Sequence, residues 1–199
     1  MLLDFVVRPM PGPVATPRNG AQWVDTPAAL RAVSEELRNA DVVGLDVETA
    51  LDFGTLCLIQ IATRNRTFLV DPFAVGDLKP IVDVLSGTRP VKVIHNARFE
   101  RRVLASLGIA LDGVYDTLEA SREARGPDAL GGHSLAMVCE RELGVSLDKA
   151  AQTSNWSRRP LSPDQLQYAA LDAEILLMLY DNARPPRQDA PAGSQARAN

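Results

Sequence analysis

The chain has 199 residues, with 21 basic and 25 acidic side chains and a formal net charge of −4 at pH 7. Hydrophobic residues make up 46% of it and aromatic residues 5%, which is typical of one soluble globular domain. These values argue against an intrinsically disordered chain, a disulfide-stabilised scaffold and a strongly basic DNA-coating protein. They do not exclude a nucleic-acid enzyme, because catalytic acids and basic phosphate contacts can cancel in the net charge.

The two cysteines, Cys57 and Cys139, lie in apolar stretches, which favours buried structural thiols. The sequence contains no CxxC pair or Cys/His cluster that would indicate zinc. Its start, MLLDFVV, lacks the basic residues and the long apolar run of a signal peptide. No stretch approaches the roughly 20 apolar residues of a membrane span. We therefore expect a cytoplasmic protein without membrane association.

The two ends differ in composition from the middle of the chain. Residues 1–21 are predicted to be a proline-rich N-terminal extension, because prolines recur from position 9 to position 17. Residues 185–199 have almost nothing to bury and are predicted to be a flexible C-terminal tail. One compact domain is expected between them, over residues 22–184.

The first half of this domain alternates between helix and strand signals. Thr26 followed by Pro27 predicts a helix to about residue 38. Three strands are then expected at 42–48, 55–62 and 67–70. A short helix near 78–85, a strand at 91–95 and a helix at 97–107 follow, the last one ending at Gly108.

Helices dominate the second half. They are predicted at 117–124 and at 134–143, the second capped by Ser134 and ended by Gly144. Ser162, with Gln165 three residues later, predicts the start of a last helix that extends to about residue 182. Three consecutive strands, followed by both strands and helices, indicate an α/β fold with a central mixed β-sheet flanked by helices.

The first predicted chemical feature is a pair of acids in the strand at 42–48. Asp46 and Glu48 are two residues apart, so their side chains lie on the same face of the strand. Two neighbouring buried carboxylates repel each other unless a cation neutralises them, and Mg²⁺ prefers carboxylate oxygens. The pair alone is weak evidence, because a D-x-E triplet occurs by chance about once in every chain or two of this size.

The last helix carries a second candidate pair. Tyr168 and Asp172 are four residues apart and therefore stack on one side of the helix. They lie beside the apolar stripe formed by Leu166, Ala169, Ala170, Ala173, Leu176, Leu177 and Tyr180. For an isolated Y-x-x-x-D pair, a partly buried tyrosine beside a solvated acid is the simpler interpretation.

The third feature is the segment His95-Asn96-Ala97-Arg98-Phe99-Glu100, where a strand gives way to a helix. Asn96 is predicted to be the N-cap of that helix. Glu100 lies in the first turn, where a negative charge suits the helix dipole even without any other role. His95 is expected to end the strand.

Together, and in this order, these segments resemble the DEDD superfamily of 3′→5′ exonucleases and its tyrosine-bearing branch. Asp46-Val47-Glu48-Thr49 is similar to the first motif, His95 to Glu100 to the second, and Tyr168 to Asp172 to the third. Other short segments resemble ribonuclease D: Tyr115-Asp116-Thr117, His133-Ser134-Leu135, Leu147-Asp148-Lys149, Gln152, Trp156 and Arg159-Pro160-Leu161. The resemblance covers about residues 22–184 and implies a ribonuclease H-like fold.

This resemblance implies catalysis with two divalent metal ions, Mg²⁺ or Mn²⁺, roughly 4 Å apart around a phosphodiester. Asp46 would bridge both ions, and Glu48 and Asp172 would hold the ion next to the nucleophile. Tyr168 would orient the attacking water. Glu100 would support the second ion, although the family has an aspartate at that position. Its extra methylene predicts a reduced rate or a changed metal preference.

The resemblance also implies contacts with the substrate, which we expect to be the 3′ end of single-stranded nucleic acid. The residues expected to contact it are Thr49, His95, Asn96, Phe99, Lys149, Trp156 and Arg159. Phosphate contacts are further considered for Arg98, Arg101, Arg102 and Arg158, with surface solvation as the alternative for each. Trp156 is a candidate for stacking on a base, and packing under the last helix is its alternative.

Three functional hypotheses remain at this stage: an exonuclease acting on RNA, one acting on DNA, and a non-catalytic relative that binds nucleic acid or protein. The intact Tyr168/Asp172 pair favours an enzyme, whereas Glu100 favours the inactive relative. The chain stops about fifteen residues past the last helix, so we expect no helical nucleic-acid-binding domains of the ribonuclease D kind. Limited processivity, or a protein partner that adds grip on the substrate, is therefore predicted.

Overall fold

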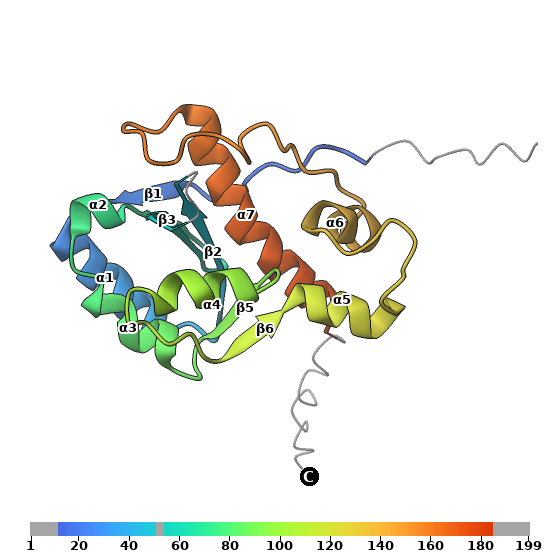
Figure 1. The fold of residues 1–199 in the computed structure, drawn as a ribbon, viewed down its shortest axis with the longest axis horizontal. Coiled ribbons are helices and arrows are strands. Elements are labelled where there is room, and N and C mark those ends of the chain that lie inside the picture. The colour runs from blue at the N-terminus through green and yellow to red at the C-terminus, as the bar shows by residue number, and fades with distance from the viewer. Residues whose placement is uncertain (1–11, 51–53, 185–199) are drawn as a thin grey trace, which may run out of the picture.

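A six-stranded mixed sheet forms the centre of the molecule (Figure 1). This computed structural model describes residues 12–50 and 54–184. The strand order is β1-β4-β3-β2-β5-β6. Strand β3 is antiparallel to both of its neighbours, while all other neighbouring pairs are parallel. The predicted α/β architecture, a mixed sheet flanked by helices, is confirmed.

The elements agree with the predicted ones to within a few residues at each end. The strands are β1 (Ala21–Val24), β2 (Val42–Thr49), β3 (Leu56–Ala62), β4 (Thr67–Val70), β5 (Val91–Ile94) and β6 (Val114–Asp116). The helices are α1 (Pro27–Arg38), α2 (Pro72–Val75), α3 (Lys79–Ser86), α4 (Arg98–Ala105), α5 (Thr117–Arg125), α6 (Leu135–Leu143) and α7 (Pro163–Asn182). Sequence reasoning missed β1, α2 and β6, which are only three or four residues long.

Side-chain caps begin the helices where the sequence predicted them. The Thr26 hydroxyl accepts a hydrogen bond from the Ala29 amide at 3.2 Å. At α7, the Ser162 hydroxyl accepts from the Gln165 amide at 3.2 Å, and the Gln165 side chain accepts from the Ser162 amide at 2.9 Å. These reciprocal bonds satisfy amides that have no partner within the helix, which fixes the position where α7 begins.

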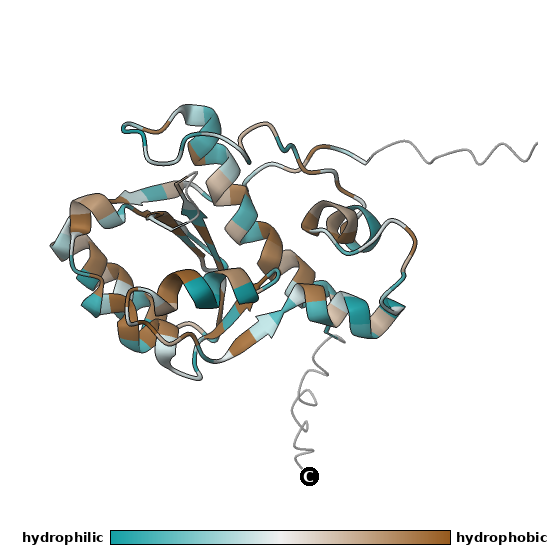
Figure 2. Cartoon of the chain, in the orientation of Figure 1, coloured by the Kyte–Doolittle hydropathy of each residue, from teal (hydrophilic) through white to brown (hydrophobic). Residues whose placement is uncertain are grey.

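The two faces of the sheet bury different sets of side chains. Val43, Leu45 and Val47 of β2 join the core beneath α1, α3 and α4. On the opposite face, Val42 packs against Ala173 and other residues of α7. Hydrophobic residues accordingly concentrate along the strands and the middle of α7 (Figure 2). The strict alternation along β2 directs Asp46 and Glu48 toward the α7 side.

Helix α7 is buried on two sides, and so more completely than the single predicted stripe suggests. The sheet covers one side of it, and α6 covers another through contacts with Leu171, Ile175 and Leu179. Both cysteines are buried, as predicted, and Cys139 belongs to this α6–α7 cluster. The burial on both sides fixes α7 firmly over the sheet.

The described part of the proline-rich segment, residues 12–20, is attached to the domain. It contains no helix and only an isolated bridge between Val14 and Ser146. The carboxylate of Glu174 on α7 accepts hydrogen bonds from the Arg18 amide at 2.7 Å and from the Thr67 hydroxyl at 2.7 Å. Residues 1–11 and the predicted tail at 185–199 lie outside the described residues.

Helix α7 packs closely against the sheet at Gly44. A Cβ atom at this position would lie 2.0 Å from the backbone oxygen of Ala173. Glycine is therefore required here to let the helix backbone approach β2. Gly44 is two residues before Asp46, and Ala173 directly follows Asp172, so this contact also sets the separation between the two acids.

Gly44→Ala is expected to lower the free energy of unfolding by about 1–3 kcal/mol, because the added methyl group overpacks the interface between α7 and β2. Urea denaturation of the purified variant would measure the change. Gly20→Ala is the matched control, since no atom lies within 4 Å of a Cβ at that position. Equal midpoints for the two variants would contradict the proposed close contact.

Candidate active site

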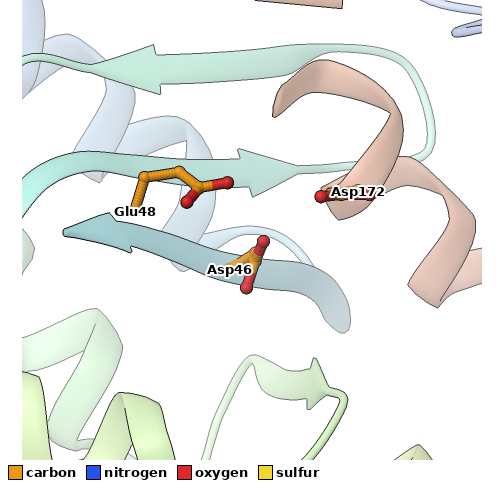
Figure 3. A group of neighbouring side chains, drawn as sticks. All are labelled: Asp46, Glu48 and Asp172. Atoms are coloured by element: carbon orange, nitrogen blue, oxygen red, sulfur yellow. The ribbon is translucent and has the colours of Figure 1, made fainter. Parts of the chain in front are cut away.

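Three carboxylates converge on the α7 side of the sheet. Asp46 and Glu48 project from β2, and Asp172 projects from α7. One ligand atom from each residue lies within 4.8 Å of the other two. Figure 3 shows the three side chains directed into a shared space between the strand and the helix. The two-residue spacing on β2 and the close packing at Gly44 together bring them there.

A fourth acid, Glu100, reaches Asp46 from the first turn of α4. Its side chain is buried, with 3% of the residue exposed, so it is not simply a surface charge near a helix end. It hydrogen-bonds to the carboxyl group of Asp46. Its Oε2 atom is buried without a hydrogen-bond partner. Glu100 thus adjoins the three converging acids through Asp46.

The electrostatics of this acidic cluster (Asp46, Glu48, Glu100 and Asp172) favour uptake of protons or cations. Burial raises the pKa of each of the four carboxyl groups. For Glu48, the charges of Asp46 and Asp172 raise the pKa further. Within residues 12–50 and 54–184, no basic side chain forms an ion pair with the cluster. Buried acids without basic partners and an unsatisfied oxygen suit a hard divalent cation, which binds oxygen ligands.

Tyr168 lies one helical turn before Asp172 and shares its environment. Its hydroxyl lies close enough to the Asp172 carboxyl group to interact with it. Burial and the charge of Asp172 raise the pKa of Tyr168, which keeps the hydroxyl protonated. Asp172 is only 7% exposed, so the interpretation of this pair as a tyrosine beside a solvated acid is wrong.

A cleft of about 540 Å³ opens over the acidic cluster. Its lining includes most of the predicted site residues: Asp46, Glu48, His95, Asn96, Phe99, Tyr168 and Asp172. His95 contacts the Thr117 hydroxyl at 2.9 Å. Burial lowers the pKa of His95, so it is mainly neutral at pH 7. The structure thus brings residues from all three motifs to one cavity.

Four predicted contact residues do not line this cleft. Thr49 is half-buried at the end of β2, and Lys149 is exposed on a loop. Trp156 is 2% exposed and packs near Tyr168 with ring centroids 6.0 Å apart. Base stacking by Trp156 is therefore wrong for this structure, and packing under α7 is correct. The indole lies beneath the cleft, where it supports Tyr168.

Arg159 is fixed elsewhere by internal contacts. Its guanidinium forms an ion pair with Asp71 at 2.7 Å and donates to the Cys57 carbonyl at 2.7 Å. It also lies over the rings of Trp23 and Phe73. Its predicted substrate contact is therefore wrong for this structure, because its donors already have partners in the fold.

The N-cap prediction for Asn96 is also wrong. Ala97 is the N-cap of α4, and Asn96 has a positive φ of 65°. The carboxylate of Asp116 accepts from the amides of Asn96 and Ala97, at 2.9 and 2.8 Å. The same carboxylate caps α5 by accepting from the Leu118 amide at 2.9 Å. Asp116 therefore holds the starts of α4 and α5 together beside the cleft.

Sequence reasoning assigned no contact with the substrate to several other residues of the cleft: Leu118, Arg122, His133, Ser134 and Gln152. Three of them, His133, Ser134 and Gln152, belong to the quoted ribonuclease D-like segments, which was the available signal. Their positions depend on contacts between distant segments, which motif spacing does not encode.

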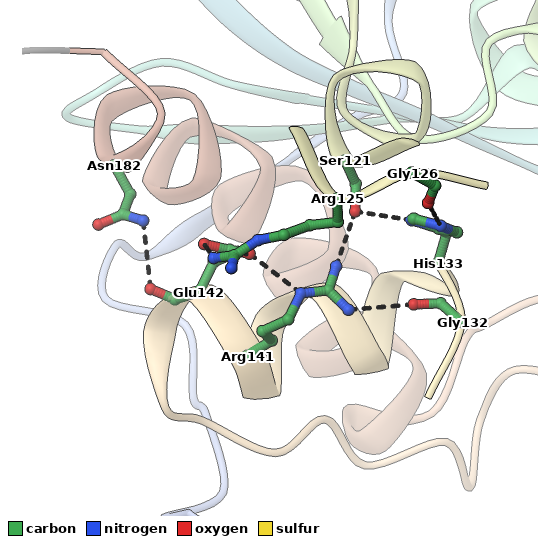
Figure 4. Close-up of polar contacts among 8 residues, drawn as sticks. All are labelled: Ser121, Arg125, Gly126, Gly132, His133, Arg141, Glu142 and Asn182. Atoms are coloured by element: carbon green, nitrogen blue, oxygen red, sulfur yellow. Dashed lines mark hydrogen bonds and ion pairs between the residues drawn. The ribbon is translucent and has the colours of Figure 1, made fainter. Parts of the chain in front are cut away.

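His133 is held by a chain of hydrogen bonds between α5 and α6 (Figure 4). Arg141 donates to the Ser121 hydroxyl at 2.7 Å, and this hydroxyl contacts His133 Nδ1 at 2.9 Å. The other ring nitrogen of His133 contacts the Gly126 carbonyl at 2.9 Å. An ion pair between Arg125 and Glu142 also joins the two helices. These contacts fix one wall of the cleft.

Residues 21–185 match a family described as 3′-5′ exonuclease. The chain belongs to this family, and its predicted membership is confirmed. It is a 3′-5′ exonuclease domain of the ribonuclease D type. Among its described helices, none combines the length and the apolar character that crossing a bilayer requires.

Two relatives and one solved structure illustrate the similarity. Exosome complex exonuclease RRP6 of Saccharomyces cerevisiae is 34% identical over 167 residues, which are 81% of this chain and 22% of that protein. Ribonuclease D of Nitrobacter hamburgensis is 35% identical over 158 residues, covering 77% and 41% respectively. The chain thus spans less than half the length of either relative.

The catalytic core of RRP6 from Trypanosoma brucei superposes with a TM-score of 0.74 at 30% identity. The match covers 87% of this chain and 49% of that one. This agreement confirms the predicted ribonuclease H-like fold.

Without metal, the protein is expected to lose stability as the pH rises. The raised pKa values mean that the native state keeps its protons to higher pH than the unfolded chain, so the free energy of unfolding falls with pH. The fall begins near the ordinary carboxyl pKa of about 4 and extends at least to about 8, the raised pKa of Asp172. Thermal denaturation in the presence of a chelator, at pH values from about 5 to 8, would measure this fall in stability.

Asp172→Asn and added Mg²⁺ are the controls for this pH dependence. The variant lacks one of the titrating groups and should show a smaller decrease in Tm over the same range. Saturating Mg²⁺ should also reduce the decrease, because bound cations compete with protons. A pH dependence of Tm that neither treatment alters would contradict the assignment to this cluster.

Proposed function

We propose that this chain hydrolyses single-stranded nucleic acid from its 3′ end with two divalent ions, and that it acts on RNA rather than DNA. The observation that carries the proposal is the convergence of Asp46, Glu48 and Asp172 with Tyr168 in one cleft. The preference for RNA is supported by the names of the relatives, ribonuclease D and the exosome exonuclease RRP6. The cytoplasmic location stays a prediction.

The acidic cluster offers ligands for two ions. Asp46, Glu48 and Asp172 would hold one of them, since their oxygens lie within 4.8 Å of one another. Asp46 and Glu100 would hold the other, Glu100 through its unsatisfied Oε2. Bound there, Mg²⁺ or Mn²⁺ ions supply an activated water and charge stabilisation for the phosphodiester and its leaving oxygen.

The chain's own residues position the substrate and the water. The Tyr168 hydroxyl, oriented by Asp172, lies where it can hold the attacking water. Phe99 and Leu118 give the cleft apolar surface for the terminal nucleoside. Placement of this kind accounts for much of the rate in phosphoryl transfer, because misplacement by 1 Å can slow a reaction about 100-fold.

The direct test offers 5′-labelled RNA and DNA strands of equal length to the pure protein, with Mg²⁺, Mn²⁺ or chelator. A ladder that shortens from the 3′ end of RNA, only with metal, is the expected result. Faster shortening of DNA would overturn the RNA preference alone. Strand binding without degradation in any metal would overturn the proposed activity and favour a non-catalytic relative.

Asp46→Asn and Asp172→Asn are expected to reduce Mg²⁺-dependent hydrolysis about 10³-fold or more. Each change removes a charged oxygen ligand while keeping the side chain's size, and metal catalysis is worth several kcal/mol of barrier. Initial rates on a labelled RNA strand would measure the loss. Asp128→Asn, an exposed aspartate outside the cleft, should keep wild-type activity. A tenfold change in rate corresponds to about 1.4 kcal/mol in activation free energy. If either cluster variant kept a rate within tenfold of the wild type, the proposal would be contradicted.

Tyr168→Phe is expected to lower kcat by about 10- to 100-fold with little change in KM, because it removes only the hydroxyl that orients the water. Steady-state kinetics on a short RNA would separate the two constants. Tyr115→Phe is the matched control, because Tyr115 packs against Tyr180 outside the cleft. A large rise in KM with an unchanged kcat would instead assign Tyr168 to substrate binding.

A further inference from the structure

A second hollow of about 610 Å³ adjoins the active-site cleft. Asn96, Leu118 and Arg122 line both cavities, so the two lie side by side. The second hollow lies at the starts of α4 and α5, where the parallel strands β5 and β6 end. The carboxyl ends of neighbouring parallel strands are a common place for ligands in α/β folds.

Three arginines line this second hollow: Arg98 and Arg101 from α4, and Arg122 from α5. All three residues are exposed. Arg101 is steadied by donating to the Leu111 carbonyl at 2.6 Å. We call this hollow the arginine groove. Its guanidinium groups have planar donor pairs that match the oxygens of a phosphate.

Among the described residues, these arginines are not neutralised by ion pairs. Arginines elsewhere in the fold, such as Arg66 and Arg159, form ion pairs with carboxylates. In the part of the chain that the structure describes, no ion pair involves Arg98, Arg101 or Arg122. Their positive charge is therefore available to a ligand.

Two carboxylates also face the arginine groove, Asp116 and Glu119. Asp116 is occupied, because it accepts hydrogen bonds from three backbone amides at the starts of α4 and α5. Glu119 is exposed in the first turn of α5. Basic groups therefore exceed acidic ones in the groove, whereas the adjoining cleft contains the acidic cluster.

We propose that the arginine groove binds the phosphate backbone of the substrate strand on the 5′ side of the scissile bond. This rests on the proposed function, since a 3′-5′ exonuclease that holds the terminal phosphodiester in its cleft leaves the rest of the strand on the 5′ side. Phosphates recur along that strand, and the arginines line the groove that lies beside the cleft. The groove would give this domain its grip on long substrates.

The test replaces the three arginines together, as Arg98→Gln, Arg101→Gln and Arg122→Gln. Binding of a 5′-labelled RNA 12-mer is followed by fluorescence anisotropy at several salt concentrations, in an Asp46→Asn background with Mg²⁺ so that the strand stays intact. Loss of three phosphate contacts should reduce the slope of log K against log salt by about 2, since each contact with a single strand contributes about 0.7.

Two comparison variants make the result specific. The remote variant carries Arg31→Gln, Arg38→Gln and Arg89→Gln, which change the net charge equally at exposed sites outside the groove. It should keep the wild-type slope. Arg98→Lys, Arg101→Lys and Arg122→Lys keep the positive charges and should restore most of the slope. Equal loss of slope in the groove variant and the remote variant would overturn the proposal, because any surface charge would then contribute equally to binding.

Hydrolysis by the same arginine variants without the Asp46→Asn change gives an independent readout. A dinucleotide has one phosphodiester, the one that is cut, and therefore leaves no phosphate for the groove. The ratio of kcat/KM on the 12-mer to that on the dinucleotide should fall roughly tenfold in the glutamine variant. Normal hydrolysis with an unchanged ratio and slope would overturn the groove alone. A reduced slope in a protein that hydrolyses nothing would support the groove and overturn the proposed function.

Discussion

The constraint on which the rest of the structure depends is the gathering of four acidic side chains, two buried and two half-buried, that form no ion pair with a basic side chain among the described residues. Like charges held this close in a desolvated site oppose folding, so the surrounding structure has to hold them in place. The contact at Gly44 and Ala173 does so directly, because it brings the backbone of α7 against β2 where Asp46 and Asp172 project. Hydrophobic burial on both faces of the sheet offsets this repulsion. Bound cations or protons would offset the remaining repulsion between the carboxylates.

The walls of the cleft are held by polar contacts that take no part in the chemistry. Asp116 fixes the starts of α4 and α5 with a single carboxylate. Arg141 and Ser121 orient His133 between α5 and α6. Trp156 supports Tyr168 from below. Such supporting contacts restrict the side chains that line the site, and placement to within a fraction of an ångström is what catalysis requires.

The acidic residues of the site were predicted through their resemblance to the exonuclease motifs, and local spacing by itself gives only the face that each pair shares. Asp46 and Glu48 share a strand face, and Tyr168 and Asp172 share a helix face, so short-range periodicity places each pair correctly. Residues such as Trp156 and Arg159 were assigned to the substrate from their place in family-like segments, whereas their surroundings come from distant parts of the chain. Arg159 pairs with Asp71, 88 positions away. Neither propensity nor motif spacing encodes such contacts, nor the short strands β1 and β6.

Glu100 brings a fourth carboxyl group to the site from the first turn of α4. It hydrogen-bonds to Asp46, and its second oxygen has no hydrogen-bond partner among the described residues. Beside it, ligand atoms of Asp46, Glu48 and Asp172 lie within 4.8 Å of one another. A glutamate at this position therefore keeps the oxygen ligands of both proposed ions available, and it is compatible with an active enzyme.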